Sequence, residues 1–300
     1  MSFEPPRDEL VQQKFPQIKQ LALLDKGGFK AVYKASIAGH NEAFKLIQLP
    51  RVEDTADEDA LRHEMVGRVR REVDALNKCK VPEIVKLATV PATDVQIEGR
   101  DYVGYSEEFL EGRNLWKLLR GGGTKPSEPE LRVLFVSLLK AIRELWGHGY
   151  VHRDIKPLNV MKLATDKRPF VLLDLGIAYS VRETALTVNP ADRIPATYRY
   201  LAPEMMTPGF RGNLDYRSDL YTAAMTVFEY GAQRHPLARD SDDLMQTISR
   251  ALHQAAKPLK ELRPDLSDEF CQLVDQLLKK KPALRPANLN RLIQRLGGRP

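Results

Sequence analysis

Hydrophobic residues are spaced differently in the first and second parts of the chain. Up to about Leu110, short apolar runs separated by Gly, Asn and Pro predict β-strands at 31–33, 43–47 and 102–105. One long segment between these runs has helical spacing, because its apolar residues recur every three or four positions: Leu61, Met65, Val69, Val73 and Leu76. The first part is therefore predicted to be a small β-sheet with one long helix.

From about Leu115 onward the helical spacing dominates. It predicts helices over residues 128–148, 220–231, 242–255, 267–280 and 288–296. Ser127 is the expected N-cap of the first of these helices, and Glu130 is its expected partner in a capping box. The change from strands to helices falls near Glu111 and Gly112, which predict a turn at a boundary between two domains.

Composition and charge remove several other classes of protein. The chain has 300 residues, 43% hydrophobic and 29% charged, so it is long enough for two domains and too apolar to be disordered. Its 46 Lys and Arg and 40 Asp and Glu give a net charge of +6 that is not strongly clustered, so no nucleic-acid partner is expected. Cys79 and Cys271 are too few for a disulfide framework and are expected to pack in the interior. With no signal peptide and no apolar run of about 18 residues, the sequence predicts a soluble, cytoplasmic protein without a membrane partner.

Three motifs carry the candidate chemistry. Residues 152–159 read His-Arg-Asp-Ile-Lys-Pro-Leu-Asn and precede an apolar pair. Residues 171–176, Val-Leu-Leu-Asp-Leu-Gly, have the pattern of a buried strand that ends in an acidic residue and a glycine. Residues 197–204 read Thr-Tyr-Arg-Tyr-Leu-Ala-Pro-Glu.

In this order and spacing, the three motifs resemble the eukaryotic-like, Hanks-type Ser/Thr protein kinase family, over about residues 18–296. The resemblance implies an α+β, protein-kinase-like bilobal fold, with a small antiparallel β-sheet N-lobe that carries one long helix and a larger, mainly helical C-lobe. Residues 1–17 would be an N-terminal extension, 18–110 the N-lobe that clamps the nucleotide, and 111–300 the C-lobe with the catalytic loop, activation segment and substrate platform. The implied cofactors are ATP and Mg²⁺, with Mn²⁺ as the alternative metal ion.

The resemblance also implies a role for each polar residue of the first two motifs. Asp154 would orient the attacking hydroxyl or accept its proton, and Lys156 would stabilise the charge on the transferring phosphate. Asn159 and Asp174 would hold the metal ion against the phosphates of ATP. Gly176 would permit the sharp backbone turn after Asp174.

Lys45 lies where the family's lysine contacts the α- and β-phosphates of ATP. Its ion-pair partner is expected on the long helix, where Glu72 fits the family pattern best and Glu64 and Asp74 are rivals. Glu64 precedes Glu72 by eight residues (72 minus 64), about 12 Å along a helix, so the two glutamates cannot both serve.

The loop expected to cover the phosphates departs from the family's Gly-x-Gly-x-x-Gly pattern. From Asp25 it reads Asp-Lys-Gly-Gly-Phe-Lys, so Asp25 and Lys30 replace the outer glycines. Gly27 and Gly28 remain the expected phosphate-binding residues, because glycines let backbone N–H groups approach a phosphate. Direct contact of Lys26 or Lys30 with phosphate, and a solvent-facing role for both, remain open.

Residues 106–112 match the segment that links the two lobes in the family. By alignment, the backbone of Glu108 and Leu110 would bind adenine, with apolar walls formed by Val32, Ala43 and Met161. Glu107 would then occupy a position at the back of the pocket that is normally apolar. A buried carboxylate there needs a partner or water.

The third motif implies a protein substrate. Ala202-Pro203-Glu204 matches the family's peptide-docking segment, Arg285 matches the arginine that pairs with that glutamate, and Asp219 matches the aspartate that braces the catalytic loop. Lys156 together with Thr197 resembles the Ser/Thr-specific members. The expected partners are therefore proteins with Ser or Thr acceptors, and a regulatory partner.

Regulation by autophosphorylation is a further hypothesis. Arg153 is of the type that pairs with a phosphate in the family's activation segment, where the candidate phosphosites are Ser180, Thr184 and Thr187.

Two other functions compete with an active Ser/Thr protein kinase. A pseudokinase that acts as a scaffold would explain the altered glycine loop and Glu107, but Lys45, Asp154, Asn159 and Asp174 are all retained. A small-molecule kinase would share the catalytic residues but not the Ala-Pro-Glu segment.

Overall fold

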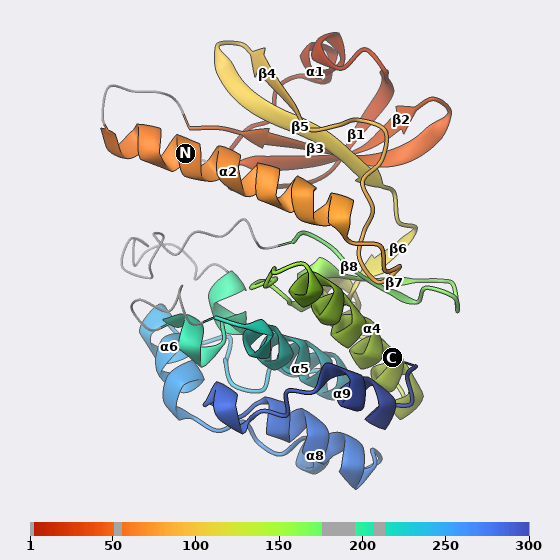
Figure 1. Ribbon diagram of the computed structural model, residues 1–300, viewed down its shortest axis with the longest axis vertical. Helices are drawn as coiled ribbons and strands as arrows, with labels where there is room; N and C mark the ends of the chain where they lie inside the picture. Colours follow the sequence, from red (N-terminus) through yellow and green to blue (C-terminus); the bar gives the residue numbers. More distant parts are fainter. Residues whose placement is uncertain (1–2, 51–55, 176–195, 207–213, 300) are drawn as a thin grey trace. The chain divides into compact units, whose positions relative to one another are not determined.

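The structure, a computed structural model, describes residues 3–50, 56–175, 196–206 and 214–299 (Figure 1). The chain divides into two compact units. Unit 1 consists of Met1–Lys78 with Val85–Glu111, and unit 2 of Cys79–Ile84 with Gly112–Pro300.

Unit 1 is built on an antiparallel sheet whose strands lie in the order β1-β2-β3-β5-β4. Their bounds are β1 Ile18–Gly27, β2 Lys30–Ile37, β3 His40–Gln48, β4 Thr93–Ile97 and β5 Arg100–Glu108. Its helices are α1 Asp8–Lys14 and α2 Ala56–Lys78. The strands predicted at 31–33, 43–47 and 102–105 and the long helix are therefore confirmed.

The two faces of this sheet form two different cores, because side chains alternate along each strand. On one face, Phe44 and Leu46 pack with Phe15 and Val11. On the other face, Ile47 and Tyr105 pack with Val69 of α2. Lys45 lies between Phe44 and Leu46 in sequence, so it belongs to the face that α2 covers.

The first residues of the chain, predicted to be an N-terminal extension, group with this unit. Phe3, Val11 and Phe15 are buried in the first core. A Cβ on Gly104 would approach the ring of Phe15 to 2.4 Å, so this glycine makes room for the ring. Isolated apolar residues in a polar segment gave no periodic pattern from which this packing could be predicted.

Unit 2 contains a small antiparallel sheet, in the order β6-β7-β8, and most of the helices. The strands are β6 Gly112–Asn114, β7 Val160–Leu163 and β8 Phe170–Leu172. The α-helices are α3 Leu115–Arg120, α4 Glu128–Gly147, α5 Tyr216–Ala232, α6 Leu244–His253, α7 Leu259–Leu262, α8 Asp268–Leu277 and α9 Leu289–Arg295. Short 3-10 helices are η1 Pro157–Asn159, η3 Ala196–Tyr200, η4 Pro203–Met206 and η6 Pro282–Leu284.

Helix α5 is the centre of unit 2, because every residue from Ser218 to Ala232 is buried. A helix that is buried on all sides must be surrounded by other elements, and α4 and α8 pack against this one. It begins at Tyr216, earlier than predicted, because the Asp215 carboxylate caps it by accepting from the backbone N–H of Arg217 at 2.8 Å.

The predicted capping box at the start of α4 is half correct. Ser127 Oγ accepts from the N–H of Glu130 at 3.5 Å, as an N-cap does. The Glu130 carboxylate instead accepts from Lys162 Nζ at 2.6 Å and from the Tyr230 hydroxyl at 2.7 Å. Two tertiary donors thus occupy the side chain that a capping box would turn back on the helix.

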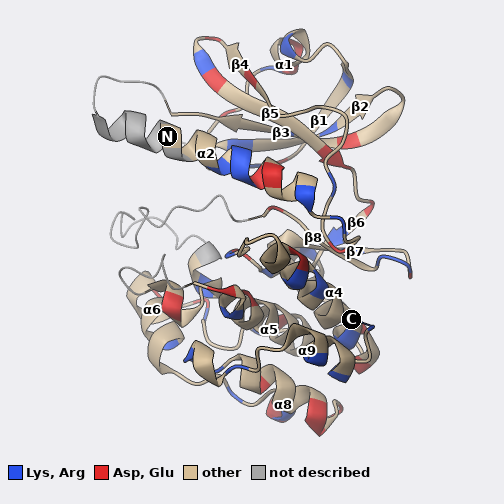
Figure 2. Cartoon of the chain, in the orientation of Figure 1, with Lys and Arg blue, Asp and Glu red and all other residues tan. Residues whose placement is uncertain are grey.

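Basic and acidic side chains are interspersed on the helices of both units (Figure 2). Cys79 and Cys271 are buried, as predicted. No helix in the described part of the chain has both the length and the apolar composition needed to cross a membrane.

Candidate active site

The backbone of the first motif is held by Asp219, in the first turn of α5. The Asp219 carboxylate accepts from the N–H groups of His152 at 2.7 Å and Arg153 at 2.8 Å. Arg153 has a left-handed φ of 69°, a costly conformation for a residue with a side chain, and these two hydrogen bonds fix it. Burial raises the pKa of Asp219 to about 7, although both hydrogen bonds favour the ionised form. This places Asp219 in the bracing position that the resemblance implies.

His152 connects this loop to the segment that carries Asp174. Its Nδ1 accepts from the N–H of Asp154 at 3.2 Å, so its Nε2 is the nitrogen that donates to the carbonyl of Leu173, at 3.3 Å. Burial lowers the pKa of His152 to about 4, which keeps the ring neutral. A neutral ring with both nitrogens bonded is a fixed spacer between two chain segments.

Two of the predicted residues, Lys156 and Asn159, contact the Asp154 carboxylate. Lys156 Nζ lies 2.9 Å from Oδ1 and 2.8 Å from Oδ2 of Asp154. Asn159 Nδ2 donates to Oδ2 and to the backbone carbonyl of Asp154, both at 2.9 Å. Burial raises the pKa of Asp154, and the charge of Lys156 and the two side-chain hydrogen bonds oppose this effect.

Asp174 follows β8 and lies close enough to Asp154 for its charge to raise the pKa of Asp154 further. The backbone brings the two together, since the N–H of Leu173 donates to the carbonyl of Asn159 at 2.8 Å. Asp174 has a φ of 44°, so the chain turns at this residue.

Asn159 and Asp174 suit a metal ion that takes few protein ligands. The NH₂ group of Asn159 donates to Asp154, which leaves its amide oxygen as the donor atom for a cation. Among the described residues, His, Cys, Asp and Glu form no group of three or more that could hold a metal ion. An amide and a carboxylate fit Mg²⁺, which keeps several waters and is commonly bound by one or two carboxylates together with substrate phosphates.

In unit 1, two glutamates converge on Lys45. Lys45 Nζ lies 3.5 Å from Oε1 of Glu72 and 2.6 Å from Oε1 of Glu107, with all three side chains buried. The rival Asp74 pairs instead with Lys78 at the surface, at 2.7 Å. The side chain of the other rival, Glu64, lies outside the described residues.

The contact between Lys45 and Glu107 was missed by the sequence analysis, which placed Glu107 at the back of the pocket without a partner. Only the strand register could have found it. Ala43 pairs with Glu107 and Lys45 with Tyr105 across β3 and β5, so Lys45 and Glu107 are diagonal neighbours on one face of the sheet.

The turn between β1 and β2 contains the expected phosphate-binding glycines. Gly27 pairs with Lys30, and Gly28 lies in the turn between them. Neither glycine has a positive φ, and a Cβ on either would meet nothing within 4 Å. The fold therefore does not require glycine at either position, in contrast to Gly104.

The charged residues of this turn have local partners. Asp25 Oδ1 accepts from the N–H of Lys26 at 2.9 Å. Lys26 Nζ lies 2.9 Å from both carboxylate oxygens of Glu4, in an exposed ion pair. The sequence left open whether Lys26 contacts phosphate or faces solvent. In the structure its ammonium group is exposed and pairs with Glu4.

The residues predicted to surround adenine fall in different units. Val32 pairs with Lys45, which places Val32 and Ala43 on the same face of the unit 1 sheet as the lysine. At the end of unit 1, the N–H of Glu108 donates to the carbonyl of Lys86 at 2.9 Å, and Leu110 follows β5. Met161 lies on β7 of unit 2, paired with Val171.

Glu204 and Arg285 form a bidentate ion pair in unit 2, at 2.6 and 2.8 Å, in which Arg285 is buried and Glu204 is partly buried. Arg285 also donates to three backbone carbonyls, those of Lys279, Lys280 and Arg217. Burial alone would raise the pKa of Glu204, but hydrogen bonding and the charge of Arg285 lower it below its usual value. The pair fixes the Ala-Pro-Glu segment to the chain around Arg285.

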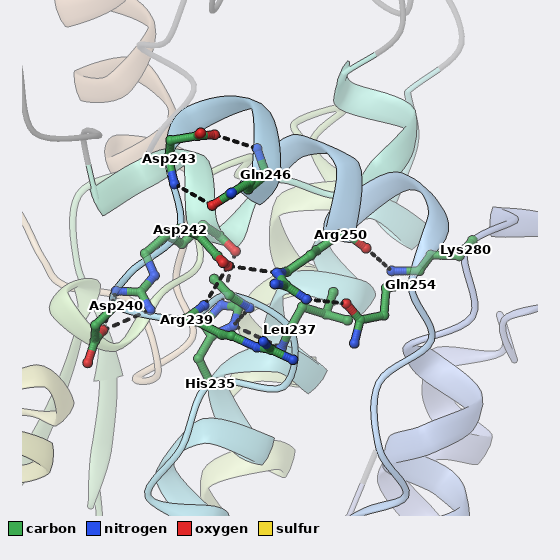
Figure 3. A network of polar contacts seen from close by, with 12 residues as sticks. His235, Leu237, Arg239, Asp240, Asp242, Asp243, Gln246, Arg250, Gln254 and Lys280 are labelled. Carbon is green, nitrogen blue, oxygen red and sulfur yellow. Dashed lines mark hydrogen bonds and ion pairs between the residues drawn. The ribbon is translucent and has the colours of Figure 1, made fainter. Parts of the chain in front are cut away.

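A second network beside this segment was missed by the sequence analysis. His235 Nδ1 accepts from the N–H groups of Leu237 and Ala238, and its Nε2 bonds to the carbonyl of Arg199 at 3.0 Å. Arg199 in turn pairs with Asp240 at 3.2 Å. Figure 3 shows His235 and Asp240 in the loop before α6, beside Asp242 and its ion-pair partner Arg250. The contacts of Arg199 with His235 and Asp240 join segments that are far apart in sequence, so no local motif predicts them.

Several predicted residues cannot be placed. Gly176 and the candidate phosphosites Ser180, Thr184 and Thr187 lie outside the described residues, as does the side chain of Thr197.

Comparison with known proteins agrees with this geometry. The protein kinase domain family matches residues 18–295. A serine/threonine-protein kinase of Mycobacterium tuberculosis, PknD, is 30% identical over 281 residues, which cover 92% of this chain and 38% of that protein. A probable serine/threonine-protein kinase of Clostridium acetobutylicum is 28% identical over 273 residues, covering 90% of this chain and 38% of the relative. The chain thus spans less than half the length of these two relatives.

Solved structures show the same fold. The kinase domain of Mycobacterium tuberculosis PknI superposes with a TM-score of 0.62 at 18% identity, covering 93% of this chain and 95% of that one. Rad53 in complex with AMP-PNP gives a TM-score of 0.66 at 22% identity, covering 92% of this chain and 64% of that one.

Proposed function

Because the chain belongs to the protein kinase domain family, we propose that it transfers the γ-phosphate of ATP to Ser or Thr hydroxyls of protein substrates. The observation that carries the proposal is the buried Asp154 carboxylate, held by Lys156 and Asn159 and influenced by the charge of Asp174. Family membership implies the use of ATP and a divalent metal ion. Mg²⁺ is the ion we propose, with Mn²⁺ as the alternative.

Asp154 is the proposed base. Burial raises its pKa, which makes its ionised form a better proton acceptor, while Lys156 favours that ionised form. The two hydrogen bonds from Asn159 fix the carboxylate so that it meets the substrate hydroxyl in one orientation. Such a positioned base contributes about 10²- to 10⁴-fold to the rate.

Charge neutralisation is the second part of the mechanism. Asn159 and Asp174 would hold the metal ion, which neutralises the charge on the β- and γ-phosphates when it is bound. Lys156 is proposed to stabilise charge on the transferring phosphate, and Lys45 to bind the α- and β-phosphates. Gly27 and Gly28 support a phosphate-covering role for their turn, because the fold itself does not require glycine at either position.

Protein rather than small-molecule substrates are supported by the third motif. The bidentate pair of Glu204 and Arg285 fixes the segment that docks peptides in the family. Lys156 and Thr197 suggest Ser and Thr as acceptors. Autophosphorylation at Ser180, Thr184 or Thr187, read by Arg153, stays a prediction.

The test is phosphoryl transfer from labelled ATP to generic protein substrates in the presence of Mg²⁺. Wild-type protein should label the substrate, Asp154→Asn should lose about 10²- to 10⁴-fold in rate, and Asp174→Ala should lose detectable transfer. Asp166→Asn is the matched control, because Asp166 is an exposed aspartate in the turn between β7 and β8. A wild-type protein that unfolds cooperatively but transfers no phosphate would overturn the proposal in favour of a pseudokinase.

A further inference from the structure

Lys45 is held more closely by Glu107 than by Glu72. The 2.6 Å contact with Glu107 is a short, charge-assisted hydrogen bond, whereas 3.5 Å from Glu72 is at the limit of hydrogen bonding. The Lys45 and Glu107 side chains are only 4% and 3% exposed. In such surroundings the nearer carboxylate has the larger effect on where the ammonium group lies.

Lys45 and Glu107 belong to the same rigid element. They lie on β3 and β5, which form seven cross-strand pairs. The first pair is Glu42 with Glu108, and the last is Gln48 with Tyr102. The backbone ladder therefore fixes the distance between their Cα atoms. Leu87 also bridges to Glu107, which adds a second backbone constraint at the acid.

Glu72 lies on a different element, helix α2. This helix contacts the sheet through side-chain packing, for example of Val69 against Ile47 and Tyr105, whereas β3 and β5 are joined by a backbone ladder. A helix held in this way can shift relative to the sheet without breaking a backbone ladder, and Glu72 would move with it.

We propose that Glu107 is the main positioning residue for Lys45, so that the sheet, rather than helix α2, determines where this lysine lies. The inference rests on the proposed function, in which Lys45 binds the α- and β-phosphates of ATP. An ammonium group has three N–H donors, so Lys45 can bond to Glu107 and to phosphate at the same time. Glu107 then acts on the nucleotide only through the lysine.

Nucleotide affinity separates this role from a merely structural one, because only a ligand with phosphates depends on Lys45. Glu107→Gln keeps the shape of the side chain and removes its charge. It should weaken binding of Mg·ATP about tenfold or more and leave adenosine within about twofold. Glu72→Gln should weaken Mg·ATP clearly less than Glu107→Gln.

Glu42→Gln is the matched control. Glu42 is another buried carboxylate on β3, but it accepts from Ser106 and Thr89 rather than from a lysine. Its loss should leave the ratio of Mg·ATP to adenosine affinity unchanged. Equal or greater loss of Mg·ATP binding in Glu72→Gln would overturn the proposal, as would an equal loss of adenosine binding in Glu107→Gln.

A measurement without nucleotide tests the ion pair independently of the proposed function. Acetic anhydride acetylates the neutral amine, and removing a close carboxylate makes that amine easier to form. Acetylation of Lys45, followed by mass spectrometry, should therefore be several-fold faster in Glu107→Gln than in Glu72→Gln. Equal acetylation rates in the two variants would overturn the proposal. If the rates differ as expected but the wild-type protein binds no ATP, only the proposed function is overturned.

Discussion

Lys45 in unit 1 and Arg285 in unit 2 are buried cations that pair with carboxylates, and the two are held in different ways. In unit 2, Arg285 has partners for all five of its N–H donors, two on Glu204 and three on backbone carbonyls. In unit 1, Lys45 has two carboxylates, from Glu72 and Glu107, beside one ammonium group.

The difference follows from the shapes of the two cations. A guanidinium group is a planar fork that fixes a carboxylate and several carbonyls in one geometry, whereas an ammonium group is a compact charge whose donors rotate. The first arrangement suits a permanent connection between chain segments. The second suits a charge that must accept another anion, such as a phosphate, beside the one it already has.

The largest effect is expected when the guanidinium group of Arg285 is removed. Arg285→Met should lower the free energy of unfolding of unit 2 by about 3–5 kcal/mol, because the partly buried Glu204 carboxylate would lose its counter-ion and three backbone carbonyls would lose their donor. Trp116 and Trp146 both belong to unit 2, so urea unfolding followed by tryptophan fluorescence reports on this unit.

The matching double variant, Glu204→Gln with Arg285→Met, should recover part of this loss, since it leaves no uncompensated charge. If Arg285→Met costs less than about 1 kcal/mol, the contacts of Arg285 would be no more important than an exposed ion pair.

A smaller effect tests the shape of the cation. Arg285→Lys keeps the positive charge but cannot form the bidentate pair with Glu204 or reach all three carbonyls. It should still cost about 2 kcal/mol in the same urea experiment. Full retention of stability would show that charge alone, rather than the planar fork, holds the Ala-Pro-Glu segment.

Features that depend on residues close together in the sequence could be predicted. The loop of residues 152–159 could be located because its motif is continuous in sequence and resembles that of a known family. The contacts of Lys156 and Asn159 with the Asp154 carboxylate came from the structure. Strands β2, β3 and β5 could be predicted from short apolar runs between turn residues, and helix α2 from apolar residues that recur every three or four positions.

Contacts between distant segments could not be predicted in this way. The pairing of Lys45 with Glu107 depends on the register of β3 and β5, which no local pattern specifies. The burial of Phe15, at the end of helix α1, depends on the absence of a side chain at Gly104 on strand β5. Glu130 matched a capping box in sequence, but donors from Lys162 and Tyr230 occupy its carboxylate in the fold.

The pH dependence of stability tests the Glu204 ion pair further, with a smaller expected change than the Arg285 variants. The pKa of Glu204 is lowered in the folded state, so its ion pair adds stability above the ordinary pKa of a glutamate, and this stability is lost as pH falls through the lowered pKa. The loss of stability caused by Glu204→Gln should therefore be greatest near pH 7 and shrink as the pH approaches 3.

Glu229, also in unit 2, should have the opposite effect on how stability depends on pH. Burial raises its pKa to about 7, so ionising it in the fold costs stability as the pH rises from about 4.5 to 7. Glu229→Gln should remove this decline, because glutamine still accepts from the Tyr200 hydroxyl without carrying a charge. If the two glutamine variants change the pH profile in the same direction, the assignment of one of these pKa shifts is wrong.

The smallest effect is expected at the ion pair of Lys26 and Glu4, beside the turn between β1 and β2. Unlike Lys45 and Arg285, Lys26 is exposed. The two side chains are 44% and 70% exposed, so the pair contributes little to stability. Glu4→Gln leaves Lys26 without this counter-ion and should raise the affinity for Mg·ATP by about twofold at low ionic strength, because Lys26 then attracts phosphate more strongly. Salt near 1 M shortens the screening length to about 3 Å and should remove the gain. A gain that persists in high salt would mean that Glu4 acts by holding the turn in place rather than by neutralising Lys26, whereas the buried pair of Lys45 and Glu107 should show little dependence on salt.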